Sequence, residues 1–207
     1  MAEIKKPKQE RSIEKRNKIL DVGYKLIMKK GYYHTNTAEI AKAAGVSSGI
    51  VYRYFKDKKD ILLQSLKEQV EEVLFERIFT QFNNLKSKDE IPALLPIILR
   101  DFVDIHNYGL KEFNELTALS LLDKDVQEYM EYLRSRTCTI IEETLIRLGY
   151  SEYQSKEKAF MIWQLANHLC DDSVLIRHLE LDFDFIFQHS LRQIMDILEC
   201  KGLDHTF

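Results

Sequence analysis

At 207 residues, the chain is long enough for one large or two small domains. Its composition, with 45% hydrophobic and 30% charged residues, is that of a folded protein. Only seven Gly and three Pro occur, which favours helices.

Three Cys without CxxC spacing predict neither a disulfide framework nor a zinc site, so we expect no metal and no cofactor. Residues 1–10 lack an apolar secretory segment and no apolar run is long enough to span a bilayer, so we expect a cytoplasmic protein that does not contact membranes.

The charge is unevenly distributed along the chain. Residues 1–63 hold 15 Lys and Arg against 7 Asp and Glu, whereas residues 64–207 hold 15 against 26, which gives the two parts net charges of +8 and −11. A basic segment gains free energy beside a polyanion by releasing condensed counterions, and an acidic one is repelled. The charge pattern therefore predicts an N-terminal module that binds nucleic acid.

Helical periodicity runs through the whole chain. Apolar residues at helical spacing predict a first helix over about 12–30, which ends at Gly31, and a long helix that begins after Asp57 and reaches about residue 83. Strand-type alternation is not evident. Further apolar-periodic segments cover 91–108, 110–122, 124–148, 154–179 and 183–201. We predict an all-α fold with an N-terminal bundle and a larger C-terminal one.

Two short helices joined by a tight turn are predicted between residues 37 and 55. Asn36 is a suitable N-cap for the first, with Glu39 completing a capping box, and Gly45 permits the turn that ends it. Ser47 is the expected N-cap of the second, which runs to about Tyr54. Two helices separated by about three residues form a helix-turn-helix, whose outward residues face the DNA groove.

The same residues carry a resemblance to a known family. Gly31-Tyr32, the run AKAAGVSSGIVYRYF at 41–55, Lys58 and Leu62 are similar to the N-terminal region of TetR/AcrR-type (tetracycline-repressor family) transcriptional regulators, over about residues 12–63. The resemblance implies a three-helix DNA-binding domain at 1–56 and a C-terminal helical domain at 57–207 that dimerises and binds an effector. It also implies a double-stranded, pseudo-palindromic DNA operator, because a homodimer presents two recognition helices to two half-sites.

Carried over position by position, the resemblance assigns candidate DNA contacts. Groove-facing positions are Ser48, Gly49 and Ile50, although Ile50 replaces the more usual Thr and either touches a thymine methyl or packs inward. The candidates for backbone contacts are Thr35, Asn36, Thr37, Tyr52, Tyr54 and Lys58, of which Lys58 would pair with a phosphate. Ser47 is foremost a cap, and Arg53 is either a solvated charge or a DNA contact. Lys5, Lys6, Lys8 and Arg11 form a basic arm or a disordered tail.

The C-terminal domain gives weaker signals. The resemblance implies a dimer interface built from the helices at 154–179 and 183–201, whose apolar sets suit either an isologous contact or an intramolecular core. Polar and aromatic residues within apolar helices are the candidate contacts to an unknown small-molecule effector: His106, Asn107, Tyr108, Tyr132, Trp163, Gln164, Asn167 and His168.

Three functions fit the sequence to different degrees. We expect a homodimeric repressor that leaves its operator when an inducer binds. The alternative is a DNA-binding adaptor or architectural protein whose C-terminal domain binds a protein partner, which a filled core with an exposed apolar patch would favour over a closed cavity. An enzyme is disfavoured, because no phosphate-binding Gly loop, GxSxG elbow or HExxH motif is found.

Overall fold

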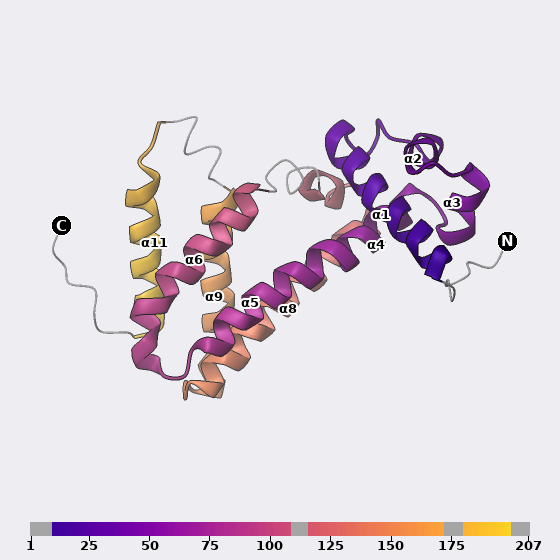
Figure 1. Ribbon diagram of the computed structural model, residues 1–207. Helices are drawn as coiled ribbons and strands as arrows, with labels where there is room; N and C mark the ends of the chain where they lie inside the picture. Colours follow the sequence, from indigo (N-terminus) through magenta and orange to yellow (C-terminus); the bar gives the residue numbers. More distant parts are fainter. Residues whose placement is uncertain (1–9, 109–115, 172–179, 200–207) are drawn as a thin grey trace. The chain divides into compact units, whose positions relative to one another are not determined.

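In a computed structural model of the chain, the described residues are 10–108, 116–171 and 180–199. Helices account for nearly all of them and no strand occurs in these ranges, so the predicted all-α fold is confirmed (Figure 1). The helices are α1 (Glu10–Lys30), α2 (Thr37–Ala44), α3 (Ser48–Tyr54), α4 (Lys58–Ser65), the π-helical segment η1 (Leu66–Glu71), α5 (Glu72–Asn84), the 3-10 turn η2 (Lys88–Glu90), α6 (Ile91–Tyr108), α8 (Lys124–Arg147), α9 (Glu152–Asp171) and α11 (Phe183–Ile197).

The predicted helices match these bounds closely. The helix expected at 91–108 is α6, and those expected at 124–148, 154–179 and 183–201 correspond to α8, α9 and α11, although the predicted residues 172–179 and 200–201 lie outside the described ones. The helix predicted beyond Asp57 consists of α4, η1 and α5, because a π-helical turn interrupts the regular hydrogen-bonding pattern. Part of the segment predicted at 110–122 lies outside the described residues.

The chain divides into two compact units that differ from the predicted domains. The N-terminal unit contains residues 10–74 and 116–130, and the C-terminal unit contains 75–108, 131–171 and 180–199. The predicted boundary at 56/57 separated α4 from the DNA-binding bundle, but Leu62 and Leu66 of α4 and η1 are buried in one cluster with Ile27 and Met28 of α1. Apolar burial therefore assigns α4 to the N-terminal unit.

Residues 116–130 complete that unit from a distant part of the sequence. Leu116, Leu119 and Val126 are buried in the same cluster as Ile27 and Leu62. Val126 lies in the first turn of α8, so this helix contributes residues 124–130 to the N-terminal unit and 131–147 to the C-terminal one. The N-terminal unit is thus built from two separate stretches of chain.

The C-terminal unit has a continuous apolar core between its helices. Buried residues of α6, α8, α9 and α11 form one cluster, and the contacts of α9 with α6 and α11 are the main ones inside the unit. None of the helices in the described ranges is long and apolar enough to cross a membrane.

Candidate nucleic-acid interface and ligand cavity

The helix-turn-helix forms as the sequence predicts, through short-range interactions. The Asn36 side chain accepts a hydrogen bond from the Glu39 backbone N–H at 2.9 Å, and the Glu39 carboxylate accepts one from the Asn36 N–H, which completes the capping box. Gly45 adopts the left-handed conformation with φ 72°, and the Val46 N–H then reaches the Ala41 carbonyl at 3.0 Å. The capping box fixes the start of α2, and the left-handed Gly45 with the Val46 hydrogen bond fixes the turn between α2 and α3.

A closely packed core holds α3 in place. Val51 and Phe55 are fully buried together with Ile40 of α2, and Ala41 and Ala44 are small enough to let the helices approach. Gly23 of α1 packs still more closely, since a Cβ there would lie 2.6 Å from Ile61 Cγ2. The inner face of the recognition helix therefore has little freedom to shift.

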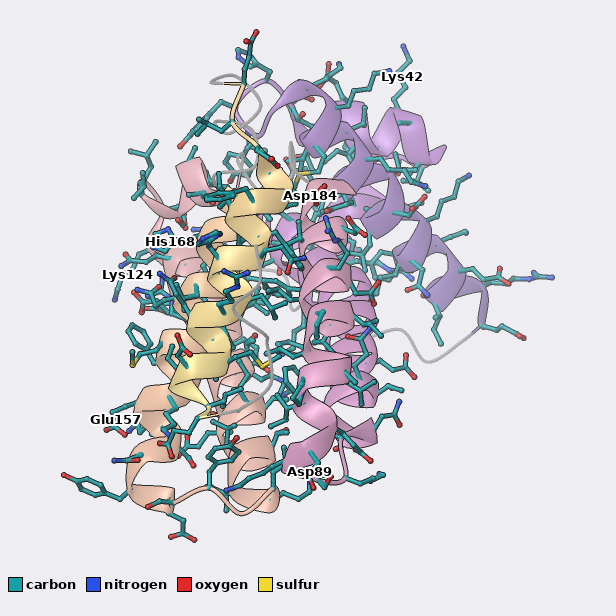
Figure 2. All side chains as sticks on the ribbon, turned by 90° about the vertical axis from the view of Figure 1, so that its left-hand side faces the viewer. Lys42, Asp89, Lys124, Glu157, His168 and Asp184 are labelled. Carbon is teal, nitrogen blue, oxygen red and sulfur yellow. The ribbon has the colours of Figure 1, made fainter. Side chains whose placement is uncertain are left out.

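The opposite face of α3 is exposed. Ser48, Gly49, Tyr52 and Arg53 point away from the core, and the Tyr52 hydroxyl donates to Thr37 Oγ1 at 3.4 Å. Lys42 of α2 also extends into solvent (Figure 2). These side chains and amides are available to an external partner. Ile50 is half-buried against the core, so it packs inward, as the second of its two predicted roles requires.

Ser47, next to this face, does not act as predicted. It occupies the N-cap position of α3 with an extended backbone, but its side chain makes no capping hydrogen bond. The expected satisfaction of α3 amides by the Ser47 hydroxyl is therefore absent. Ser47 is exposed, so its hydroxyl joins the polar surface formed by Ser48 and Asn36.

Two of the candidate backbone contacts have internal roles instead. Thr35 is 2% exposed and its hydroxyl donates to the Gly31 carbonyl at 3.0 Å. Tyr54 is 3% exposed, with its hydroxyl 2.6 Å from Ser12 Oγ and accepting a hydrogen bond from Arg53. Burial leaves neither hydroxyl free to reach a phosphate, and both stabilise the loop and helices around α3.

Lys58 also turns inward. Its ammonium group donates to the Tyr32 carbonyl at 2.5 Å and to the Thr35 carbonyl at 2.9 Å, and it lies 4.2 Å from the centroid of the Tyr32 ring. Burial lowers the pKa of Lys58. A lysine held by two carbonyls and a ring fixes the loop between α1 and α2.

The neighbouring Lys59, which sequence reasoning missed, makes a different connection. Its ammonium lies 3.1 Å from the Asp123 carboxylate and 2.5 Å from that of Asp125, and these bonds raise its pKa. Asp123 also accepts hydrogen bonds from the backbone N–H groups of Asp125 and Val126, so it caps α8. The two partners are 64 residues apart, and a local pattern cannot reveal such a pair.

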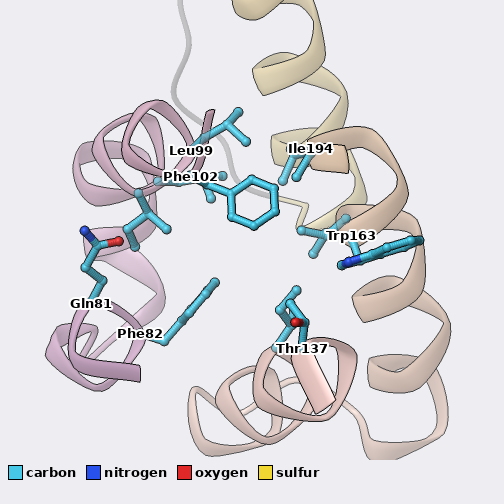
Figure 3. Close-up of a pocket in the computed structure, with 12 residues that line it drawn as sticks. Gln81, Phe82, Leu99, Phe102, Thr137, Trp163 and Ile194 are labelled. Atoms are coloured by element: carbon cyan, nitrogen blue, oxygen red, sulfur yellow. The ribbon is translucent and has the colours of Figure 1, made fainter. Parts of the chain in front are cut away.

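The C-terminal unit contains an apolar cavity of about 40 Å³. On this measure about 10–15 Å³ holds one water molecule, so the space would hold about three. Ten of the twelve lining side chains are apolar, and they come from α5, α6, α8, α9 and α11: among them are Phe82, Leu95, Leu99, Phe102, Ile162 and Ile194 (Figure 3). The two polar ones are Gln81 and Thr137. Such walls suit the apolar part of a small molecule.

The predicted effector contacts match this cavity at one position. Trp163 lines it, but Gln164 and Asn167 do not. Tyr132 is exposed with its hydroxyl bonded to Arg136, and His168 lies at the surface of α9 (Figure 2). The side chains of three other candidates lie outside the described part of the structure: His106, Asn107 and Tyr108. No group of three or more His, Cys, Asp or Glu suited to a metal occurs among the described residues.

The helices expected to form a dimer interface bury much of their apolar surface internally. Leu169 of α9 and Phe187, Leu191 and Ile194 of α11 belong to the core of the C-terminal unit, as does Leu198 just beyond α11. These residues therefore belong to an intramolecular core, the second of the two predicted roles, because α9 and α11 pack on each other. Exposed apolar side chains remain on both helices: Tyr153, Phe160, Met161 and Phe185.

Comparison with known proteins gives the strongest match at the helix-turn-helix. The model of bacterial regulatory proteins of the tetR family matches residues 19–64, from the middle of α1 to the last turn of α4. The HTH-type transcriptional regulator HbdR of Aromatoleum sp. is 46% identical over 54 residues, which are 26% of this chain and 24% of that protein. The first relatives found are matched over only about a quarter of their length.

Two further similarities extend into the C-terminal unit. An uncharacterized HTH-type transcriptional regulator in the lacX 3' region of Lactococcus lactis is 31% identical over 139 residues, covering 64% of this chain and 69% of that protein. The solved structure of the fatty acid degradation regulator FadR from Bacillus halodurans has a TM-score of 0.66 at 21% identity, and the alignment covers 97% of this chain and all of that one. The latter similarity establishes the fold of both units.

Proposed function

Since this chain belongs to the tetR family of bacterial regulatory proteins, we propose that it is a homodimeric repressor that binds a pseudo-palindromic operator and leaves it when a small molecule binds. The observation that carries the proposal is the exposed polar face of α3 on a rigid core, in the part of the chain that is strongly basic. A helix of this kind enters the major groove while the surrounding charge attracts the phosphates.

The proposed DNA contacts are a revised subset of the predicted ones. Ser48 and Gly49 begin α3 and face the bases, while Asn36, Thr37, Ser47, Tyr52 and Arg53 contact the backbone. Thr35, Tyr54 and Lys58 support these residues from inside. Arg53 is the one basic residue of α3, and its guanidinium retains donors beyond the one that Tyr54 accepts.

Selection from a pool of random DNA duplexes, followed by affinity measurements at several salt concentrations, tests DNA recognition. We expect Arg53→Gln to weaken binding to all duplexes about five- to tenfold and to reduce the salt slope by about one, because one phosphate contact is lost. Ser48→Ala should instead change which duplexes are selected. Lys25→Gln removes the same charge from an ion pair within α1 and serves as the matched control.

Two results would contradict the DNA interface. If Arg53→Gln and Lys25→Gln change the affinity and the salt slope equally, α3 does not approach the phosphates. If the unaltered protein selects no common duplex, it does not recognise a sequence.

The dimer is proposed to form through α9 and α11. The exposed Phe160, Met161 and Phe185 on these helices would be covered in a symmetric contact. Native mass spectrometry of the full chain should give mainly a dimer, and Phe185→Asp with Phe160→Asp should give a monomer. A monomer in the unaltered protein at micromolar concentration would contradict this arrangement.

The cavity favours a chemical signal over a protein partner. An apolar void within a core is destabilising unless a ligand fills it, and a surface for a protein partner does not require one. A ligand that binds better to the shape with low DNA affinity must weaken DNA binding by the same factor that DNA weakens ligand binding.

A further inference from the structure

The cavity in the C-terminal unit has chemically different surroundings on its two sides. In Figure 3, Gln81 of α5 and Trp163 of α9 lie on opposite sides of the ring of lining residues. The Gln81 side-chain amide donates a hydrogen bond to the Asp101 carboxylate, so an acidic residue lies beside this side of the cavity.

A cation lies at the Trp163 side. The guanidinium carbon of Arg134 is 5.1 Å from the centroid of the Trp163 ring, a distance that gives a cation–π contact. Arg134 precedes the cavity residue Thr137 by one helical turn on α8, so its stem and the Thr137 side chain lie on the same face. Trp163 is partly buried and Thr137 is buried, whereas Arg134 itself is exposed.

In the part of the chain that the structure describes, the N–H donors of Arg134 have no hydrogen-bond acceptor. Arg100 is 3.0 Å from the Asp184 carboxylate, and Arg136 donates to the Tyr132 hydroxyl, but within the described ranges no carboxylate, hydroxyl or carbonyl accepts a hydrogen bond from Arg134. A guanidinium held over a ring presents several N–H groups in a planar fork that matches a carboxylate or phosphate. Arg134 is therefore an exposed cation that lies over the ring of a cavity-lining residue.

We infer that the effector is an amphipathic anion, with an apolar tail in the cavity and an anionic head bound by Arg134 beside Trp163. The inference rests on the proposed function as a ligand-responsive regulator and specifies the chemistry of its ligand. A carboxylate and a phosphate would both satisfy the guanidinium, and the apolar walls select the tail by size alone. The cavity is small, so a tail longer than a few carbons must displace the Phe82 or Phe102 side chain.

The position of Trp163 allows a direct test. It is the only Trp in the chain, so intrinsic fluorescence reports on the cavity without a label. The full-length protein without DNA is titrated with octanoate, octanol and octyltrimethylammonium, which share one tail and differ in head charge. We expect saturable quenching or a spectral shift with octanoate, and weaker binding of octyltrimethylammonium by about tenfold.

Variants separate the head-group contact from the tail. Arg134→Gln should weaken octanoate binding about tenfold, which corresponds to about 1.4 kcal/mol, and leave octanol binding unchanged. Arg134→Lys should recover part of the loss, and Arg134→Glu should favour octyltrimethylammonium over octanoate. Arg136→Gln removes the same charge two residues further along α8 and should leave octanoate binding within about twofold of the original, since Arg136 donates to the Tyr132 hydroxyl, lies over the Phe75 ring and does not lie over Trp163.

Several outcomes would overturn the inference. One is an unchanged octanoate affinity in Arg134→Gln, and another is no saturable binding of octanoate to the unaltered protein. If Arg134→Gln weakens the binding of octanol as much as that of octanoate, the role of Arg134 is purely structural. Circular dichroism and thermal unfolding of each variant confirm that it is folded. The titration contains no DNA, so it is independent of the test of operator binding. Ligand binding can fail while operator binding is intact, and operator binding can fail while the ligand titration succeeds.

Discussion

The two units of the protein use buried space in opposite ways. In the N-terminal unit the helices approach until a single added carbon at Gly23 would collide with Ile61, and polar groups such as Lys58 and Thr35 fix the loops from inside. In the C-terminal unit long helices enclose a void lined mainly by interchangeable apolar side chains. This difference agrees with the proposed function, in which the first unit presents α3 in one orientation and the second admits a ligand.

The largest effect is expected from removing packing in the C-terminal unit. Ile194 is fully buried and lines the cavity, so Ile194→Ala should lower the free energy of unfolding by about 3 kcal/mol while enlarging the void. Urea unfolding followed by Trp163 fluorescence measures this unit alone. A loss below about 1 kcal/mol would mean that the helices close over the gap and that the cavity is not rigidly maintained.

An intermediate effect is expected from enlarging one small side chain in each unit. Gly23→Ala places a Cβ 2.6 Å from Ile61 Cγ2 and should destabilise the N-terminal unit by about 1–2 kcal/mol, despite the higher helix propensity of Ala. Ala166→Val adds atoms to a cavity wall and should be neutral or stabilising, by less than about 1 kcal/mol.

Unfolding monitored by circular dichroism and by Trp163 fluorescence distinguishes the two units. Gly49→Ala is the control, because Gly49 is a helical glycine with open space around it, where the nearest atom to an added Cβ is 3.9 Å away. Equal costs for Gly23→Ala and Ala166→Val would remove the contrast between the units.

The smallest effect concerns the ion pair of Lys59 and Asp123. Burial by itself raises the pKa of Asp123, but hydrogen bonds from Lys59 and from the N–H groups of Val126 and Asp125 outweigh it and lower the pKa. The stabilisation is therefore present above the ordinary Asp pKa of about 4 and is lost as the pH falls through the lowered value. Asp123→Asn should cost less than about 1 kcal/mol near neutral pH and nothing in acid.

Chemical unfolding at a series of pH values measures this difference. Asp21→Asn is the comparison variant, since Asp21 pairs with Lys25 within α1 at the surface and its loss should cost less. A pH-independent cost for Asp123→Asn would show that capping of α8, and not charge, is what Asp123 contributes.

The contrast between the units also explains which features the sequence could predict. The helix-turn-helix depends on contacts within a few residues, such as Asn36 with Glu39 and the left-handed Gly45, and such contacts leave a local pattern. The inward direction of Lys58 depends on carbonyls more than 20 residues away, and a family resemblance transfers only the residue type. Cavity residues such as Leu99 and Ile162 share the periodicity of ordinary core residues, so only Trp163 among the lining residues was predicted.

The discontinuous make-up of the N-terminal unit limits how the protein can be recombined. A chimaera that joins residues 1–56 to another regulator would leave Ile27 and Met28 without Leu62, Leu116 and Val126, and would separate Lys59 from Asp123. Joining after residue 74 keeps α4 but still omits residues 116–130. A transplanted N-terminal unit must therefore carry the beginning of α8 as well, and a single junction cannot exchange it intact.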